Sequence, residues 1–104
     1  MIVEKLQTDL VSAQKEKAAQ KVLVIRYLIS QIRNFEIEIR VENRSLTDED
    51  ALLVLKRQIK RRKKAIEEFE RGNRPDIVTK EKEELALVET YYTDFAKELG
   101  VAQE

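Results

Sequence analysis

The chain carries a dense run of basic side chains in its middle. Residues 56–64 read Lys-Arg-Gln-Ile-Lys-Arg-Arg-Lys-Lys, so seven of nine positions are basic. The chain as a whole has no net charge, because its 20 Lys and Arg match its 20 Asp and Glu. Nucleic-acid backbones are bound chiefly through clustered Lys and Arg. This run is therefore the part of the sequence that most favours phosphate binding.

The same sequence lacks the side chains on which most enzyme chemistry depends. It has no Cys and no His, which excludes disulfides and thiolate metal sites and removes the commonest general base. The adjacent carboxylates of Glu83 and Glu84 would point to different sides of a helix and so form no acid/base pair. No Gly-rich phosphate loop or catalytic triad is recognisable. We expect no catalytic residue, no cofactor and no metal, and hence no enzyme.

Nothing in the sequence indicates a membrane segment or a targeting signal. No apolar run approaches the roughly 18–20 residues that a helix needs to cross a bilayer. The first five residues, Met1-Ile2-Val3-Glu4-Lys5, lack a signal-peptide pattern. We expect a cytoplasmic protein with no membrane partner.

Apolar residues recur at steps of three and four along nearly the whole chain, which is the spacing of amphipathic helices. With two Gly and one Pro as breakers, the pattern predicts four helices in a single domain. Their expected ranges are about 2–17, 20–43, 48–71 and 75–99. Because short loops between long helices favour antiparallel neighbours, we expect an all-α fold. It would be an antiparallel helical hairpin extended into a bundle of three to four helices.

Several residues predict where the helices begin and end. Thr47 is expected to cap the third helix as part of a capping box, because its hydroxyl can accept a hydrogen bond from a backbone N–H. Gly72 is predicted at the left-handed position that ends this helix. Pro75 suits the first turn of the fourth helix, and Gly100 marks its end. Residues 17–21 contain neither cap nor breaker, so the first two helices either bend there or run on.

On the third helix the basic run does not form a single stripe. A heptad-like apolar seam starts at residue 52, and Arg62 falls on it. A partly buried Arg needs a carboxylate partner, and the candidates are Glu81, Glu84 and Glu36. Arg26 is also flanked by apolar residues. We expect both arginines to form ion pairs that link helices.

The other six basic residues of the run leave two explanations open. They are Lys56, Lys60, Lys63 and Lys64 beside the seam and, pointing more outward, Arg57 and Arg61. In one explanation the outward members contact phosphates along a nucleic-acid backbone. In the other they form a solvated helix face, stabilised by acidic side chains three or four positions away: Glu67, Glu68 and Glu70. The acidic segment 73–104 could also neutralise the run across packed helices.

Three aromatic residues, Tyr91, Tyr92 and Phe95, cluster late in the chain. Aromatic side chains at helical spacing are more often core groups than a platform on which bases stack. We expect these three in the core.

The order and spacing of several motifs resemble the YqeY family over about residues 4–92. The matching residues are Leu6, Asp9, Leu10 and Ala13, then Arg26, Asn34 and Glu36-Ile37-Glu38, then Leu46-Thr47-Asp48-Glu49, Ile59-Lys60, Arg62-Lys63, Ile66-Glu67, Phe69, Gly72-Asn73-Arg74-Pro75-Asp76 and Lys80-Glu81. The Gly72–Asp76 turn has one residue more between Gly and Arg than the family's turn.

The resemblance implies an all-helical protein related to the C-terminal tail domain of the B subunit of the tRNA-dependent amidotransferase. That tail domain helps to hold tRNA and carries no catalytic centre. The resemblance thus implies that a protein of this family can be called amidotransferase-like although it catalyses no reaction. By this analogy Lys60, Arg62, Lys63 and Arg74 become candidate RNA contacts.

Two features depart from the family pattern. The family usually continues with Tyr-Leu-Pro-x-Gln and a second small helical subdomain, whereas Tyr91-Tyr92-Thr93-Asp94-Phe95 stands at the matching place. We therefore expect that the second, C-terminal subdomain is absent. The segment 17–21 also lacks the Asp that commonly opens the family's second helix.

Together these observations predict a non-catalytic helical module that binds tRNA, an amidotransferase or another tRNA-handling protein through the basic third helix. The candidate nucleic-acid-binding residues are Lys56, Arg57, Lys60, Arg61, Arg62, Lys63, Lys64 and Arg74. The alternative is a helical protein–protein interaction or structural domain with no nucleic-acid role.

Overall fold

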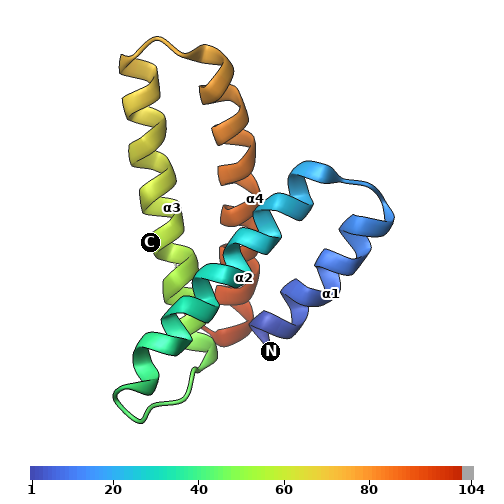
Figure 1. Cartoon of the computed structure of the whole chain (residues 1–104), viewed down its shortest axis with the longest axis vertical. Helices are drawn as coiled ribbons and strands as arrows, with labels where there is room; N and C mark the ends of the chain where they lie inside the picture. The colour runs from blue at the N-terminus through green and yellow to red at the C-terminus, as the bar shows by residue number, and fades with distance from the viewer. Residues whose placement is uncertain (102–104) are drawn as a thin grey trace.

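The computed structural model describes residues 1–101, which form four α-helices and no strand (Figure 1). The helices are α1 (Ile2–Lys15), α2 (Ala19–Arg40), α3 (Asp48–Arg71) and α4 (Pro75–Leu99). The predicted all-α bundle is confirmed, and α3 and α4 have the predicted bounds. α1 and α2 end two and three residues before their predicted ends. None of these four helices is long and apolar enough to span a membrane.

The helices form two hairpins that cross each other (Figure 1). α1 packs along α2 and α3 packs along α4, and these are the two most extensive helix contacts. α2 runs obliquely across the α3–α4 hairpin and contacts both of its helices. The far end of that hairpin projects beyond α2. We call this end the tip (residues 66–85) and the rest of the described chain the base.

The main core lies in the base, where all four helices meet. Its largest completely buried side chains share one face of each helix: Ile2 and Leu6 of α1, Ile25, Leu28 and Ile32 of α2, Leu55 of α3 and Val88 of α4. Each contributes about 1.5–3 kcal/mol of hydrophobic stabilisation. A smaller cluster in the tip contains Ile66, Val78 and Leu85, packed against Ile59 and Phe69.

All four described helices end in the same hydrogen-bonded turn, the Schellman motif. Its left-handed residue is Lys17, Asn43, Asn73 or Gly100, with φ between +55° and +68°. In each motif the N–H of the next residue donates to the carbonyl five positions back: Ala18 to Ala13, Arg44 to Ile39, Arg74 to Phe69 and Val101 to Ala96. The motif satisfies carbonyls that the last helical turn leaves without a partner.

The prediction that Gly72 is left-handed is wrong. Gly72 has a φ of −80°, and Asn73 takes the left-handed conformation instead, with a φ of +56°. Asn is the residue that tolerates this conformation best after Gly, because its short polar side chain can bond locally. At the break between α1 and α2 the left-handed residue is Lys17, for which neither propensity nor spacing gave a signal. The chain therefore turns at this segment, and the helices do not run on.

The start of α3 is the predicted capping box. The Thr47 hydroxyl accepts from the Asp50 N–H at 3.2 Å, and the Asp50 carboxylate accepts from the Thr47 N–H at 3.0 Å. Arg44 Nη1 donates to the same carboxylate at 3.0 Å. The Thr47 N–H, with the help of Arg44, holds the pKa of the Asp50 carboxyl below its ordinary value. α4 begins with Pro75, also as predicted.

Candidate nucleic-acid interface

Arg62 lies on the seam between α3 and α4 and forms the predicted ion pairs. Its Nη1 lies 3.0 Å from Glu84 Oε1 and 3.5 Å from Glu81 Oε2, and its side chain is 13% exposed. The guanidinium also stands 5.7 Å from the centre of the Tyr27 ring on α2. Arg62 Nε is buried and has no hydrogen-bond partner within residues 1–101. The side chain is thus committed to holding three helices together.

Arg26 does not form the interhelical ion pair that the sequence predicted. Its side chain is exposed, and it has no ion-pair partner in the described part of the chain. Glu36, the third candidate partner of Arg62, instead pairs with Arg33 within α2 at 3.5 Å. Apolar neighbours in the sequence do not by themselves place a residue on the buried face of a helix. Val24 and Ile25 are buried, and the next residue, Arg26, lies about 100° further around the helix and faces solvent.

Four basic side chains of the run are exposed and form no ion pair within residues 1–101: Arg57, Lys60, Arg61 and Lys64. Arg57 lies over the Phe35 ring of α2, with its guanidinium carbon 5.4 Å from the ring centre. This contact leaves the charge uncompensated, because a ring has no net charge. The outward side of α3 therefore presents several cations that are available to an anionic partner.

The acidic residues after the run do not neutralise it. Glu67 pairs with Arg71 at 3.7 Å, and Glu70 pairs with Lys82 at 3.5 Å. Neither lies within 4.0 Å of a cation of residues 56–64, and Glu68 has no ion-pair partner in the described chain. The helix α4 neutralises only Arg62 and, through Glu89, Lys63 at 3.7 Å. Packing of the acidic fourth helix thus leaves most of the run uncovered.

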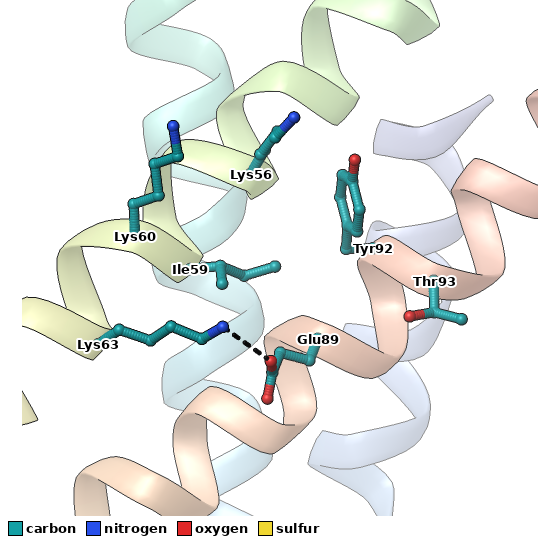
Figure 2. A pocket seen from close by; sticks show the side chains of 7 residues that line it. All are labelled: Lys56, Ile59, Lys60, Lys63, Glu89, Tyr92 and Thr93. Atoms are coloured by element: carbon teal, nitrogen blue, oxygen red, sulfur yellow. Dashed lines mark ion pairs between the residues drawn. The ribbon is translucent and has the colours of Figure 1, made fainter. Parts of the chain in front are cut away.

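A pocket of about 330 Å³ lies where α3 faces α4 in the base (Figure 2). From α3 it is lined by Lys56, Ile59, Lys60 and Lys63, and from α4 by Glu89, Tyr92 and Thr93. Figure 2 shows Ile59 at its centre, Tyr92 on the side opposite Lys56, and Lys63 directed toward Glu89. Three of the predicted basic residues therefore line one concave surface.

Arg74 lies apart from the other seven predicted residues. It stands in the turn at the tip, where its Nε is 3.9 Å from Asp76 Oδ1. Seven helical residues separate Lys64 from the end of α3, which corresponds to about 10 Å at ~1.5 Å per residue. Arg74 and residues 56–64 could touch one ligand only if that ligand is extended along the hairpin, as a nucleic-acid strand is.

The three aromatic residues near the end of α4 have different surroundings. Phe95 is buried, as predicted, and stacks on Tyr91 with 5.9 Å between ring centres. Tyr91 is half-buried, and its hydroxyl donates to Asp9 Oδ2 at 2.7 Å. Burial, together with that carboxylate, raises the pKa of the Tyr91 hydroxyl. Tyr92 packs against the core from the side and faces the pocket, so only part of this cluster is core.

Sequence reasoning missed the pocket and the contribution of Glu89 to it. The register of the α3–α4 hairpin locates both once one contact across it is known. In an antiparallel hairpin, a step back along one helix corresponds to an equal step forward along the other. The Arg62–Glu84 pair therefore places Lys56, six residues earlier, opposite about residue 90. This register would have brought the lysines and Tyr92 together.

Residues 1–101 contain no cluster of three or more acidic side chains with the arrangement of a metal site. On its outward side α3 instead presents exposed cations that have no ion-pair partner in the described residues, and on its α4 side it contributes three lysines to the pocket.

Comparisons with known proteins agree with this architecture. A protein called "Altered inheritance of mitochondria protein 41, mitochondrial" from Candida glabrata is 31% identical over 97% of this chain and 53% of its own length. The protein of the same name from Lachancea thermotolerans is 37% identical over 86% of this chain and 46% of its own length. An uncharacterized protein from Schizosaccharomyces pombe is 35% identical over 67% of this chain and 60% of its own.

The chain thus spans about half to three-fifths of the length of these curated relatives. The family model described as Yqey-like protein matches residues 3–100, which is nearly the whole sequence. This match covers the four helices, except the first residue of α1, and the complete basic run, and the chain belongs to the YqeY-like family.

Proposed function

We propose that this chain is a non-catalytic module that binds tRNA, or a protein that handles tRNA, through the outward side of α3. One observation carries the proposal. Arg57, Lys60, Arg61 and Lys64 are exposed on a single helix and have no carboxylate partner in the described residues, although the chain contains as many acidic as basic side chains. Unpaired cations in a neutral protein favour a polyanionic partner.

Family membership supports the same proposal. The family resemblance implies a relation to the tail domain that helps to hold tRNA in the amidotransferase, and such a domain needs no catalytic centre of its own. Three of the relatives have names that contain the word mitochondrial. Since tRNA is present in mitochondria as well as in the cytoplasm, the proposed function suits a mitochondrial location as well as the cytoplasmic one predicted from the sequence.

Titration of labelled tRNA at 50 mM and 200 mM salt tests the proposal. With about four phosphate contacts, the affinity should fall roughly 50- to 150-fold between the two concentrations, because each contact releases counterions. The triple variant Arg57→Gln/Arg61→Gln/Lys64→Gln should weaken binding and flatten the salt dependence. A matched control, Lys15→Gln/Lys80→Gln/Lys97→Gln, removes the same charge from exposed positions outside the run. Equal weakening by both triple variants would mean that net charge, and not α3, causes the binding.

A protein-interaction module is the second candidate, and one observation favours it. Leu23, Tyr27 and Ile37 on α2 are 59%, 43% and 58% exposed. Their spacing places them within one narrow stripe of the helix surface. If tRNA does not bind even at 50 mM salt, the first proposal fails. A protein partner that is lost in a Leu23→Ser/Ile37→Ser variant would then identify α2 as the interaction surface.

A further inference from the structure

The pocket between α3 and α4 has a chemistry more specific than that of the open face of α3. We propose that it binds a nucleotide that carries a terminal phosphate monoester, with the phosphate at Lys56 and Lys60 and the base against Tyr92. This inference rests on the proposed function, because it names the part of an RNA that would enter the pocket beside the basic helix. A 5′-phosphorylated terminus is an RNA end of this kind.

The charge of the lining residues matches a monoester better than a diester. Lys56, Lys60 and Lys63 supply three positive charges, and Glu89 supplies one negative charge. Two net positive charges remain, which would balance the two negative charges of a fully ionised phosphate monoester. An internal phosphodiester carries only one negative charge. The Lys63–Glu89 ion pair at 3.7 Å leaves Lys56 and Lys60 as the cations without a partner in residues 1–101.

The remaining lining residues suit a flat ring. Tyr92 presents an aromatic side chain opposite Lys56, and Ile59 supplies an apolar surface between the two helices (Figure 2). Bases of every type stack on aromatic side chains, so such a subsite is tolerant of sequence. The volume of about 330 Å³ lies at the small end of the ~300–1,000 Å³ range of ligand pockets, which suits one nucleotide and not several.

Because the chain has no His, a pH dependence of binding near pH 6 can be assigned to the ligand. No side-chain type in the sequence ordinarily titrates between pH 5.5 and 7.2. The groups that face the pocket are the lysines Lys56, Lys60 and Lys63 of α3 and Glu89 and Tyr92 of α4. The second ionisation of a phosphate monoester has a pKa of about 6. A change of affinity across this pH range therefore reports the ionisation of the ligand.

The test is an amide-resolved NMR titration of the full chain with adenosine 5′-monophosphate, adenosine and inorganic phosphate. At pH 7.2 the nucleotide should bind more tightly than either of the other two and shift the amide signals of Lys56, Lys60 and Tyr92. At pH 5.5 its affinity should fall about three- to fourfold, because most of the phosphate is then singly charged. A 5′-phosphorylated short RNA should likewise bind more tightly than its 5′-hydroxyl counterpart.

Variants assign the two parts of the ligand. Lys56→Gln/Lys60→Gln should lower nucleotide affinity roughly tenfold or more, because two charge-assisted contacts are lost. Tyr92→Leu should lower affinity for the nucleotide about fivefold and leave inorganic phosphate unaffected. Glu89→Gln should strengthen binding of all phosphates, and of the doubly charged monoester most, because it removes the one negative charge of the lining. Lys80→Gln, at an exposed position of the tip, is the matched control and should change nothing. Thermal melts show which variants remain folded.

The outcomes separate this inference from the proposed function. Adenosine binding as tightly as its monophosphate, or Lys56→Gln/Lys60→Gln without effect, would overturn the inference. Salt-dependent tRNA binding with no preference for a 5′-phosphate would do the same while supporting the proposed function. Nucleotide binding with the expected pH dependence, in a chain that does not bind tRNA, would support the pocket and overturn the proposed function.

Discussion

The base and the tip bury apolar side chains to different extents, although the helical repeat is the same in both. In the base, α2 crosses the α3–α4 seam, and Leu55 and Val88 are completely buried there. In the tip, Ile66, Val78 and Leu85 lie between two helices alone and remain 6–9% exposed. Two helices cover a seam from two directions, so a third helix is needed to exclude water. The repeat predicts which residues face a partner but not how many partners they have.

The charges follow the same division. Arg62 stands at the border, where α2 ceases to cover the seam, and its pairing with Glu84 and Glu81 lies half in each region. The other ion pairs of the tip, such as Arg71–Glu67 and Lys82–Glu70, are exposed and contribute little to stability. We infer that the base carries most of the free energy of unfolding and that the tip opens locally at lower cost.

The same substitution made in each region is the most direct test of the difference in stability between base and tip. Ile32→Ala removes a completely buried side chain from the base and should cost about 3–5 kcal/mol. Ile66→Ala makes the same chemical change in the tip and should cost only about 1–2 kcal/mol, because water can occupy the space that is left. Urea unfolding followed by circular dichroism measures both free energies of unfolding.

A second pair of variants with smaller changes serves if Ile32→Ala does not fold. Ile32→Val should cost about 0.5–1.5 kcal/mol and keep the chain folded, and Ile66→Val should be nearly neutral. Amide hydrogen exchange should be faster in residues 66–85 than in the base of the wild-type chain. Equal costs in the two regions, with uniform exchange, would show that the hairpin unfolds as one unit with the base.

Truncation of Arg62 should have the next largest effect. Arg62→Ala leaves Glu84, whose side chain is 12% exposed, without its cation, and should cost about 2 kcal/mol after allowance for partial solvation. The melting temperature measures this loss, and an unchanged value would refute the structural role of Arg62. The control is Lys63→Ala, which breaks an exposed ion pair between the same two helices, Lys63–Glu89, and should cost less than about 1 kcal/mol.

The double variant Arg62→Met/Glu84→Leu distinguishes two roles of this ion pair. It removes both charges and also the buried Nε that has no partner in residues 1–101. If the pair matters only because each charge needs the other, the double variant should be as stable as the wild type or more so. If the double variant is as unstable as Arg62→Ala, the contact with Tyr27 and the geometry of the ion pair themselves stabilise the base.

The sequence was sufficient for the starts of α3 and α4, and insufficient for the left-handed residue that ends α3 and for contacts that depend on how the helices pair. Thr47 and Pro75 were predicted correctly because a cap and a fixed φ act over a few residues. The burial of Arg62 followed from the seam. Arg26 was predicted wrongly because nothing in the sequence says which of its flanking residues α1 and α3 will cover. The position of Tyr92 beside Lys56 required the register of the hairpin, which only the long-range pairing provides.

Acid should weaken the base before the tip. The pKa of the Asp9 carboxyl is raised by burial, but hydrogen bonds from Tyr91 and Lys5 outweigh this and hold it below its ordinary value, as Thr47 does for Asp50. A lowered folded-state pKa gives stability that is present above pH ~4 and lost as pH falls through the folded value. Since there is no His, stability should be constant from about pH 6 to 7.

Asp9→Asn and Asp50→Asn test this expectation. Each should cost roughly 1 kcal/mol at pH 7, because a charged hydrogen bond is lost, and should make the acid transition less steep. Glu83→Gln, at an exposed position of the tip, serves as the control. A decline in stability as the pH falls from 7 to 6 would contradict the assignment of the pH dependence to these carboxylates.

The smallest effects on stability should come from the residues that end the helices. One such residue in the base can be compared with one in the tip. Lys17 of the base and Asn73 of the tip both hold a left-handed backbone, with φ of +57° and +56°. Lys17→Gly should stabilise the chain by about 1 kcal/mol, because Lys has no local bond that offsets the strain. Asn73→Gly should gain less than about 0.5 kcal/mol, because Asn already tolerates this conformation.

The glycines provide the opposite test in the same melting experiment. Gly72 has an ordinary φ of −80°, and a Cβ there would meet Glu68 O at 3.5 Å, an ordinary contact distance. Gly72→Ala should therefore be neutral or slightly stabilising. Gly100→Ala, at a φ of +68°, should cost up to about 1 kcal/mol. A large loss on Gly72→Ala would mean that the left-handed turn of the tip lies at Gly72 and not at Asn73.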